Sequence, residues 1–165
     1  MAETRKILIL SANARCMEPI DSNTELTEIK NKLYHSACDE KFEMNVTPAV
    51  GYHQVGVDVW ADKPQIVHFI GHGEQGGLIL LDERNQDKPI PVSGEKFAAL
   101  FKDANSVECI LLNACYSEEQ AEQIFKHVNV NCIIATAEKL ISNEAAVRFA
   151  KEFYQKLCEG QDYDE

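Results

Sequence analysis

Short apolar runs alternate with longer amphipathic segments along the 165 residues of this chain. The runs at residues 6–12, 65–71, 108–114 and 131–137 predict strands buried on both faces, and the alternating stretch 42–50 predicts another. Helices are expected at residues 23–37, from Ser93 onward, at 117–127 and at 143–159, with a short, weaker one within 51–62. Strands that alternate with helices in this way indicate an α/β fold with a mostly parallel central sheet covered on both faces.

The ends and faces of the helices can also be read from the pattern. Ser22 and Glu25 have capping-box spacing, and Leu26, Ile29 and Leu33 form the inward face of the helix that follows. The inward face of the last helix is expected to hold Ala146, Phe149, Ala150, Phe153 and Leu157. The run Gly77–Glu83 is expected to pair nearby as a hairpin extension. The length predicts a single domain over residues 1–165.

Composition and charge narrow the functional classes. The net charge is −11, from 27 acidic and 16 basic residues, and no cluster of lysines or arginines exceeds two neighbours. We therefore expect no nucleic-acid binding. No apolar stretch is long enough for a signal peptide or a membrane span, so we expect a soluble, cytoplasmic protein with no membrane contact.

The six cysteines show no C-x-x-C pair and no dense spacing. This pattern argues against a disulfide framework and against a zinc site, and it favours a reducing compartment in which most cysteines are small buried hydrophobes. We expect no metal and no cofactor.

The run Gly71–Gly76 matches the G-x-G-x-x-G pattern of dinucleotide-binding loops. That mechanism needs a helix that opens after the glycines, with its amides and dipole facing the pyrophosphate. Here the chain continues into the apolar run Leu78–Leu81, which suits a strand better. The glycines instead leave the imidazole of His72 and the backbone amides around it free of bulky neighbours.

Two reactive side chains follow buried strands at equivalent places. His72 follows the run 65–71, and Cys115 follows the run 108–114. In parallel sheets chemistry gathers at the carboxyl ends of the strands, so these side chains should meet if the two strands are neighbours. A histidine beside a thiol, with a helix beginning near Ser117, is the minimal equipment for nucleophilic attack on a carbonyl. The Gly73 N–H is the candidate oxyanion donor.

The other residues near these strand ends have simpler interpretations. Asn113 is expected to hold the loop together, and Tyr116 to form a wall of the cleft. His68 lies inside a strand and is expected to be a core histidine. A lone cysteine at a strand end is also commonly a packed hydrophobe, and a histidine in a glycine loop commonly bonds only to backbone, so the pairing of the two carries the hypothesis.

Other catalytic motifs are missing from the sequence. It has no G-x-S-x-G elbow, no phosphate-binding loop with G-x-x-x-x-G-K-[ST], and no H-E-x-x-H. A phospho-receiver domain shares the layered architecture but would need acids after the first strand, where residues 11–15 read SANAR.

Four segments closely resemble the CHAT domain, a family of caspase-like and separase-like cysteine peptidases common in bacteria: VHFIGHG, GLILLDE, LLNACYSEEQAEQI and ISNEAAVRFAKEFYQKLCEG. The resemblance implies a three-layer α/β/α caspase-like fold with a catalytic dyad at His72 and Cys115. It further implies that peptide bonds of a protein or peptide substrate are cleaved through a thioester acyl-enzyme. The oxyanion hole would then comprise Gly73 and the amide of Cys115. Members usually end larger proteins with helical repeats or sensor modules, and several resemble antiviral or cell-death effectors switched on by a partner.

The chain departs from the family pattern in two places. Relatives often carry an acid where this chain has Asn143, which weakens the case for a preference for basic substrates; Glu138 is the alternative acid. The chain also stops at GQDYDE, where many relatives continue with pocket-forming elements, so a fragment or an externally completed site remains an alternative. The sequence thus favours a cysteine endopeptidase that is latent until a partner activates it. The competing hypotheses are a catalytically silent interaction or regulatory domain and, third, nucleotide binding at the glycine loop.

Overall fold

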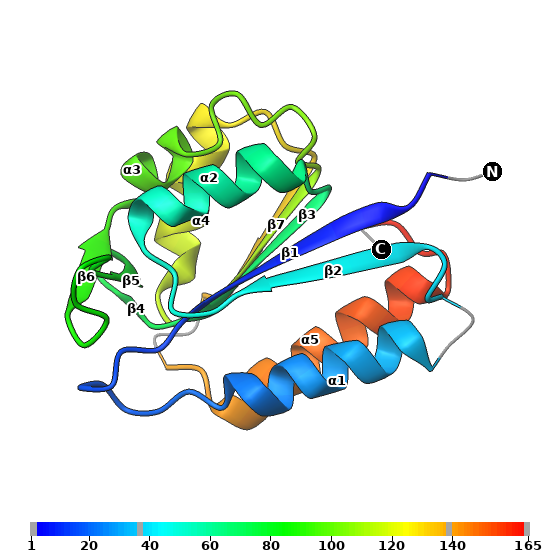
Figure 1. Ribbon diagram of the computed structural model, residues 1–165, viewed down its shortest axis with the longest axis horizontal. Helices are drawn as coiled ribbons and strands as arrows, with labels where there is room; N and C mark the ends of the chain where they lie inside the picture. The colour runs from blue at the N-terminus through cyan, green and yellow to red at the C-terminus, as the bar shows by residue number, and fades with distance from the viewer. Residues whose placement is uncertain (1–2, 36–37, 138–139, 164–165) are drawn as a thin grey trace.

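The computed structural model describes residues 3–35, 38–137 and 140–163. Its centre is a sheet of five parallel strands in the order β2-β1-β3-β7-β8 (Figure 1). The strands are β1 (Arg5–Ala12), β2 (Phe42–Thr47), β3 (Ile66–Gly71), β7 (Cys109–Asn113) and β8 (Cys132–Ala135). The predicted parallel α/β sheet is confirmed.

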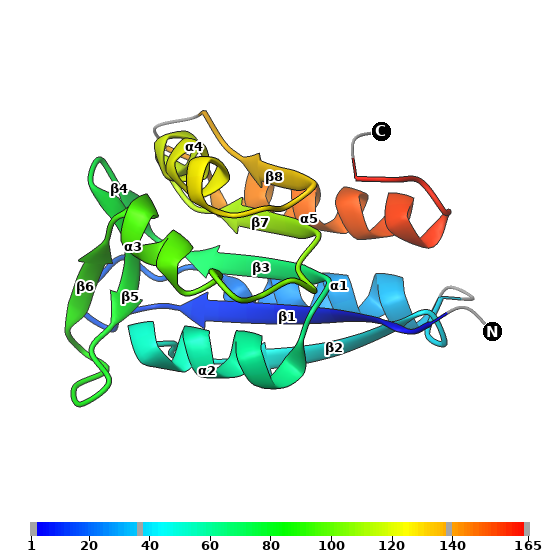
Figure 2. The same ribbon diagram turned by 90° about the horizontal axis from the view of Figure 1, so that it is seen from above.

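Helices cover both faces of the sheet. One face is covered by α1 (Ser22–Tyr34) and α5 (Asn143–Cys158), and the other by α2 (Tyr52–Asp62), α3 (Gly94–Ala99) and α4 (Ser117–His127), as Figures 1 and 2 show. Because side chains of a strand alternate between faces, β3 sends Val67 and Phe69 into one core and Ile66 and Ile70 into the other. The arrangement is the three-layer α/β/α architecture, with the strand carboxyl ends gathered at one end of the molecule.

A second, antiparallel sheet continues from the end of β3. It contains β4 (Gly73–Glu74), β5 (Gly77–Leu81) and β6 (Pro89–Val92) in the order β4-β5-β6. The expected pairing of the run after Gly77 is confirmed. Strand β6 escaped prediction because its sequence is PIPV; proline removes a ladder donor, and it is tolerated here because β6 lies at an edge of the sheet.

Two details of the predicted helices are wrong. The N-cap of α1 is Asp21, whose side chain accepts the Thr24 N–H, and Ser22 is the first residue of the helix. In α5 the inward face includes Tyr154, which is fully buried. Phe149, which was predicted to face inward, is 41% exposed. Tyr154 reaches a polar partner in the core, which a tyrosine needs in order to be buried.

The expectation of unpaired cysteines is wrong for one pair. Cys38, shortly after α1, forms a disulfide with Cys158, the last residue of α5. The two helices pack side by side, which brings together residues 120 positions apart (Figure 1). Sequence spacing gave no sign of this pairing, because it depends on the contact between the two helices. Cys16, Cys109, Cys115 and Cys132 carry reduced thiols.

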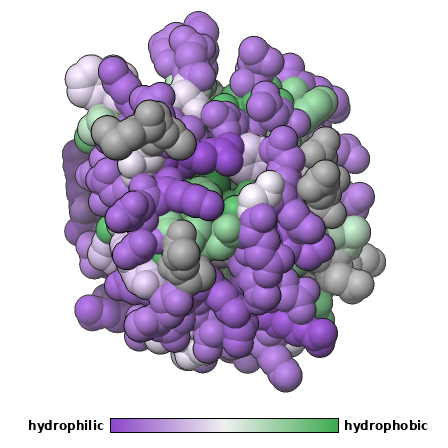
Figure 3. Space-filling view, turned by 90° about the vertical axis from the view of Figure 1, so that its right-hand side faces the viewer, coloured by the Kyte–Doolittle hydropathy of each residue, from purple (hydrophilic) through white to green (hydrophobic). Residues whose placement is uncertain are grey.

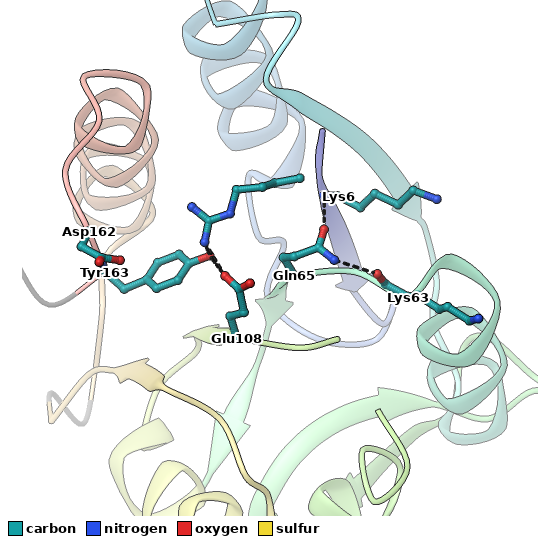
Figure 4. Close-up of polar contacts among 7 residues, drawn as sticks. Lys6, Lys63, Gln65, Glu108, Asp162 and Tyr163 are labelled. Carbon is teal, nitrogen blue, oxygen red and sulfur yellow. Dashed lines mark hydrogen bonds and ion pairs between the residues drawn. The ribbon is translucent and has the colours of Figure 1, made fainter. Parts of the chain in front are cut away.

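The opposite end of the molecule, where the strands begin, holds a polar cluster. Arg5 forms an ion pair with Glu108, and the Tyr163 hydroxyl donates to Glu108 Oε2 at 2.8 Å (Figure 4). The guanidinium also lies 4.7 Å from the centre of the Tyr163 ring. Figure 3 views this end, where hydrophilic side chains surround a hollow of about 740 Å³ lined in part by Arg5, Phe42 and Leu157.

Within the described ranges, no helix has the length and apolar character needed to cross a membrane.

Candidate active site

The two predicted reactive residues lie at the carboxyl ends of neighbouring strands. Strands β3 and β7 pair in parallel, with Ile70 opposite Asn113. His72 follows β3 directly and Cys115 follows β7 by two residues, and both side chains line one cavity of about 420 Å³. The condition on which the sequence argument depended, that the two strands are neighbours, is therefore met.

The His72 imidazole is held from the side of the loop that follows β1. Its Nε2 lies 2.8 Å from the carbonyl oxygen of Glu18. A carbonyl can only accept, so this hydrogen bond requires Nε2 to carry the proton, which leaves Nδ1 as the basic nitrogen of the neutral ring. The backbone is fixed as well, because the His72 carbonyl accepts the Ile79 N–H from β5 at 2.9 Å.

Cys115 lies in a tight turn between β7 and α4. Tyr116, directly after it, has a left-handed backbone with φ 53°, an uncommon conformation for a residue other than glycine. The fully buried hydroxyl of Ser117 donates to Leu112 O at 3.2 Å and accepts the Thr136 N–H at 3.0 Å. These bonds tie the start of α4 to β7 and to the residue that follows β8. The Cys115 side chain is half-buried, and its Sγ accepts the Ile141 N–H at 3.4 Å.

Gly73 lies against the turn that carries the thiol. A Cβ at this position would overlap the carbonyl oxygen of Cys115, so any side chain would force the two loops apart. Gly73 thereby places its backbone beside Cys115, where the sequence argument expects an oxyanion donor.

The imidazole and the thiol share the cavity without bonding to each other. In the described part of the chain, no hydrogen bond joins His72 to Cys115. The imidazole Nε2 bonds to the Glu18 carbonyl, and the thiol accepts the Ile141 N–H. Catalytic hydrogen bonds are often long before substrate binds. The arrangement provides a base, a nucleophile and a bare backbone amide around one cavity.

Two of the three predicted pocket residues line the cavity. Tyr116 and Asn143 line the cavity, and Glu138 lies outside the described residues. Asn113 does hold the strand end, as expected: its Nδ2 donates to Ala146 O at 3.2 Å and to Glu25 Oε1 at 2.7 Å.

Glu25 is the residue that the sequence argument missed. It is 1% exposed and lines the same cavity as the thiol. Its Oε1 also lies 3.1 Å from Nε2 of the buried His68, although this contact lacks hydrogen-bond alignment. The other ring nitrogen of His68, Nδ1, lies 3.0 Å from the Tyr154 hydroxyl. The signal was available, because Glu25, Ile29 and Leu33 recur at intervals of four and so share the inward stripe of α1. A carboxylate on such a stripe is rare unless it is paired.

Three other kinds of chemistry can be assessed from the same structure. Burial raises the pKa of the Cys109 thiol far above its usual range, which makes that cysteine a poor nucleophile. The loop after His72 leads into β4 and β5 and opens no helix, so the helix N-terminus required by a dinucleotide site is missing there. Among the described residues, no three metal-binding side chains gather to hold an ion.

Fold and site together define an α/β/α protein with a histidine and a cysteine at adjacent strand ends, the arrangement of caspase-like proteins. The family model for the CHAT domain matches residues 19–165, and the chain belongs to this family. Membership associates the chain with cysteine peptidase-like proteins.

The other comparisons add little. No curated protein matches the chain. Among solved structures, the signal receiver domain of a putative LuxO repressor protein from Vibrio parahaemolyticus is similar over 99% of this chain and 98% of that one, with 14% identity and a TM-score of 0.48. A likeness of this degree says nothing of function.

Proposed function

We propose that this domain is a cysteine endopeptidase in which His72 and Cys115 form the catalytic dyad. The observation that carries the proposal is that both side chains line one cavity at the ends of adjacent strands, with the Gly73 backbone packed against Cys115. Family membership supports a peptidase-like role.

The geometry suggests how the steps are divided. The Glu18 carbonyl holds the proton on Nε2 of His72, which leaves Nδ1 to take the proton from the thiol. The thiolate attacks the scissile carbonyl, whose oxygen takes up negative charge and accepts hydrogen bonds from the backbone N–H groups of Gly73 and Cys115. His72 then gives its proton to the leaving amine, and a thioester to Cys115 remains. Water attacks the thioester, releases the acid and restores the thiol.

The contacts in the cavity also support latency. The imidazole and the thiol bond to separate loops, and the thiol accepts a hydrogen bond from Ile141, just before α5. In the proposed mechanism the free domain visits the arrangement in which Nδ1 faces the thiol as a minor state, which suffices for alkylation, and an activating partner makes that state dominant. The same separation favours the competing function, a silent domain that acts by binding a partner, in which the pair never meets.

Alkylation separates the two functions. With limited iodoacetamide near neutral pH and no reductant, we expect Cys115 to label at least tenfold faster than the exposed Cys16, because the thiolate is the reacting form. Cys109 serves as the buried reference. Mass-spectrometric mapping of each cysteine gives the rates.

The variants identify the base. We expect His72→Ala to remove the excess reactivity of Cys115, while His53→Ala, an exposed histidine on α2, leaves it unchanged. Equal labelling of Cys115 and Cys16 in the wild-type protein, or no effect of His72→Ala, would contradict the dyad and favour the binding function.

A further inference from the structure

The cavity that holds the thiol has an acidic floor. Glu25 projects into it from the first turn of α1, and Glu18, an exposed residue, lies at its rim. None of the described residues that line the cavity is a lysine or an arginine. A buried acid that lines a cavity needs an explanation, because burying a carboxylate is costly unless it is paired, and the neighbours of Glu25 are Asn113 and His68.

The polar contacts of Glu25 with the other described residues converge on one oxygen, Oε1. Asn113 Nδ2, at 2.7 Å, and His68 Nε2, at 3.1 Å, both approach Oε1. Within the described residues no hydrogen bond to Oε2 is found, and Oε2 is not one of their sealed, unpaired polar atoms. This leaves one carboxylate oxygen for a ligand that enters the cavity.

The position of Glu25 relative to the thiol is suitable for a substrate side chain. Asn113 bonds to Glu25 and lies two residues before Cys115, so the carboxylate is fixed to the strand end that presents the nucleophile. When the thiol attacks a peptide carbonyl, the side chain of that residue lies beside the thiol. Ile20 and Ala146 line the cavity as well and supply apolar contact for an aliphatic stem.

We propose that Glu25 selects a basic side chain, arginine or lysine, in the residue whose carbonyl is attacked. A guanidinium or ammonium group would pair with the free Oε2, and its stem would pack on the cavity wall. The inference rests on the proposed function and gives it a substrate class. Asn143, in α5, weakened the case for a preference for basic substrates. The proposal places the selecting acid on α1 instead, at Glu25.

The test compares matched peptidyl chloromethyl ketones that end in arginine, lysine, norleucine or glutamate. We expect the basic reagents to label Cys115 at least tenfold faster than the norleucine reagent. In Glu25→Gln, whose carboxamide oxygen can still accept from Asn113, this preference should fall to about threefold or less, because the charged partner is lost. Glu28→Gln is the matched control, since Glu28 lies on the same helix, pairs with Lys151 and does not line this cavity.

The outcomes separate this inference from the dyad itself. Equal labelling by basic and neutral ketones, with iodoacetamide still selective for Cys115, would overturn the role of Glu25 and leave the dyad standing. If Cys115 is unreactive to every reagent, the dyad fails, and binding to Cys115→Ala decides the role of Glu25: an arginyl peptide should bind at least tenfold tighter than its norleucyl counterpart, and equal binding would overturn the inference. Thermal melting checks that Glu25→Gln is folded. If it is not, the absence of a preference for basic reagents in the wild type still overturns the inference.

Discussion

Gly73 is the residue at which the two loops of the candidate site come closest. Because a Cβ there would overlap the Cys115 carbonyl, Gly73→Ala should push the loops apart and reduce the excess iodoacetamide reactivity of Cys115 by about tenfold or more, since displacements of about 1 Å near reacting groups have effects of this size. Gly76→Ala is the control in the same loop, because a Cβ at that position meets no atom of the described residues within 4 Å. Unchanged reactivity in Gly73→Ala would show that the contact plays no part in placing the thiol.

The residues of the site were predictable to different degrees. His72, Cys115 and Gly73 follow from the rule that side chains after neighbouring parallel strands meet at one edge. Glu25 could have been found from its place on the inward stripe of α1, but its spacing from Ser22 suggested a cap. The Glu18 carbonyl could not be predicted, because a backbone oxygen has no side-chain signature and its position depends on the loop after β1.

At the scale of elements, the buried strands were predictable because continuous apolar runs between amphipathic segments have few alternatives in an α/β chain. Strand β6 was missed because proline is a poor strand former, and its pairing with β5 depends on tertiary contact. The inward face of α5 was mispredicted at Phe149 because apolar character alone cannot show that Tyr154 has a partner in the core.

That partner gives a prediction about how α5 is held on the sheet. Tyr154→Phe keeps the ring beside His68 but removes the hydroxyl 3.0 Å from Nδ1, leaving a fully buried ring nitrogen without its partner. We expect the free energy of unfolding to fall by about 1–3 kcal/mol. Tyr34→Phe, at a 48% exposed tyrosine of α1, should change it by less than about 0.5 kcal/mol. Urea unfolding measures both, and equal effects would mean that the buried hydroxyl contributes nothing specific.

At the scale of the whole molecule, the Cys38–Cys158 disulfide joins the ends of α1 and α5, the two helices that cover one face of the sheet. A cross-link across 120 residues restricts the unfolded chain strongly, and the usual contribution of a native disulfide is about 2–4 kcal/mol. We expect Cys158→Ser to lower the free energy of unfolding by this amount in oxidising buffer. In buffer with excess dithiothreitol the difference from wild type should nearly vanish, because the wild-type link is then open as well.

The same link tests whether the acidic cavity depends on the packing of these helices. Glu25 comes from α1 and Ala146 from α5, and both lie near the ends opposite the disulfide. A thiol titration of the unfolded, unreduced protein should count four thiols in the wild type and three in Cys16→Ser. Cys158→Ser should raise the count to five, because Cys38 then has no disulfide partner. Six free thiols in the wild type would show that the pair is reduced, and stability should then be the same with and without dithiothreitol. If the count is four, a Cys158→Ser protein whose Cys115 still labels selectively would show that the sheet and the turn after β7, rather than the cross-link, hold the candidate site together.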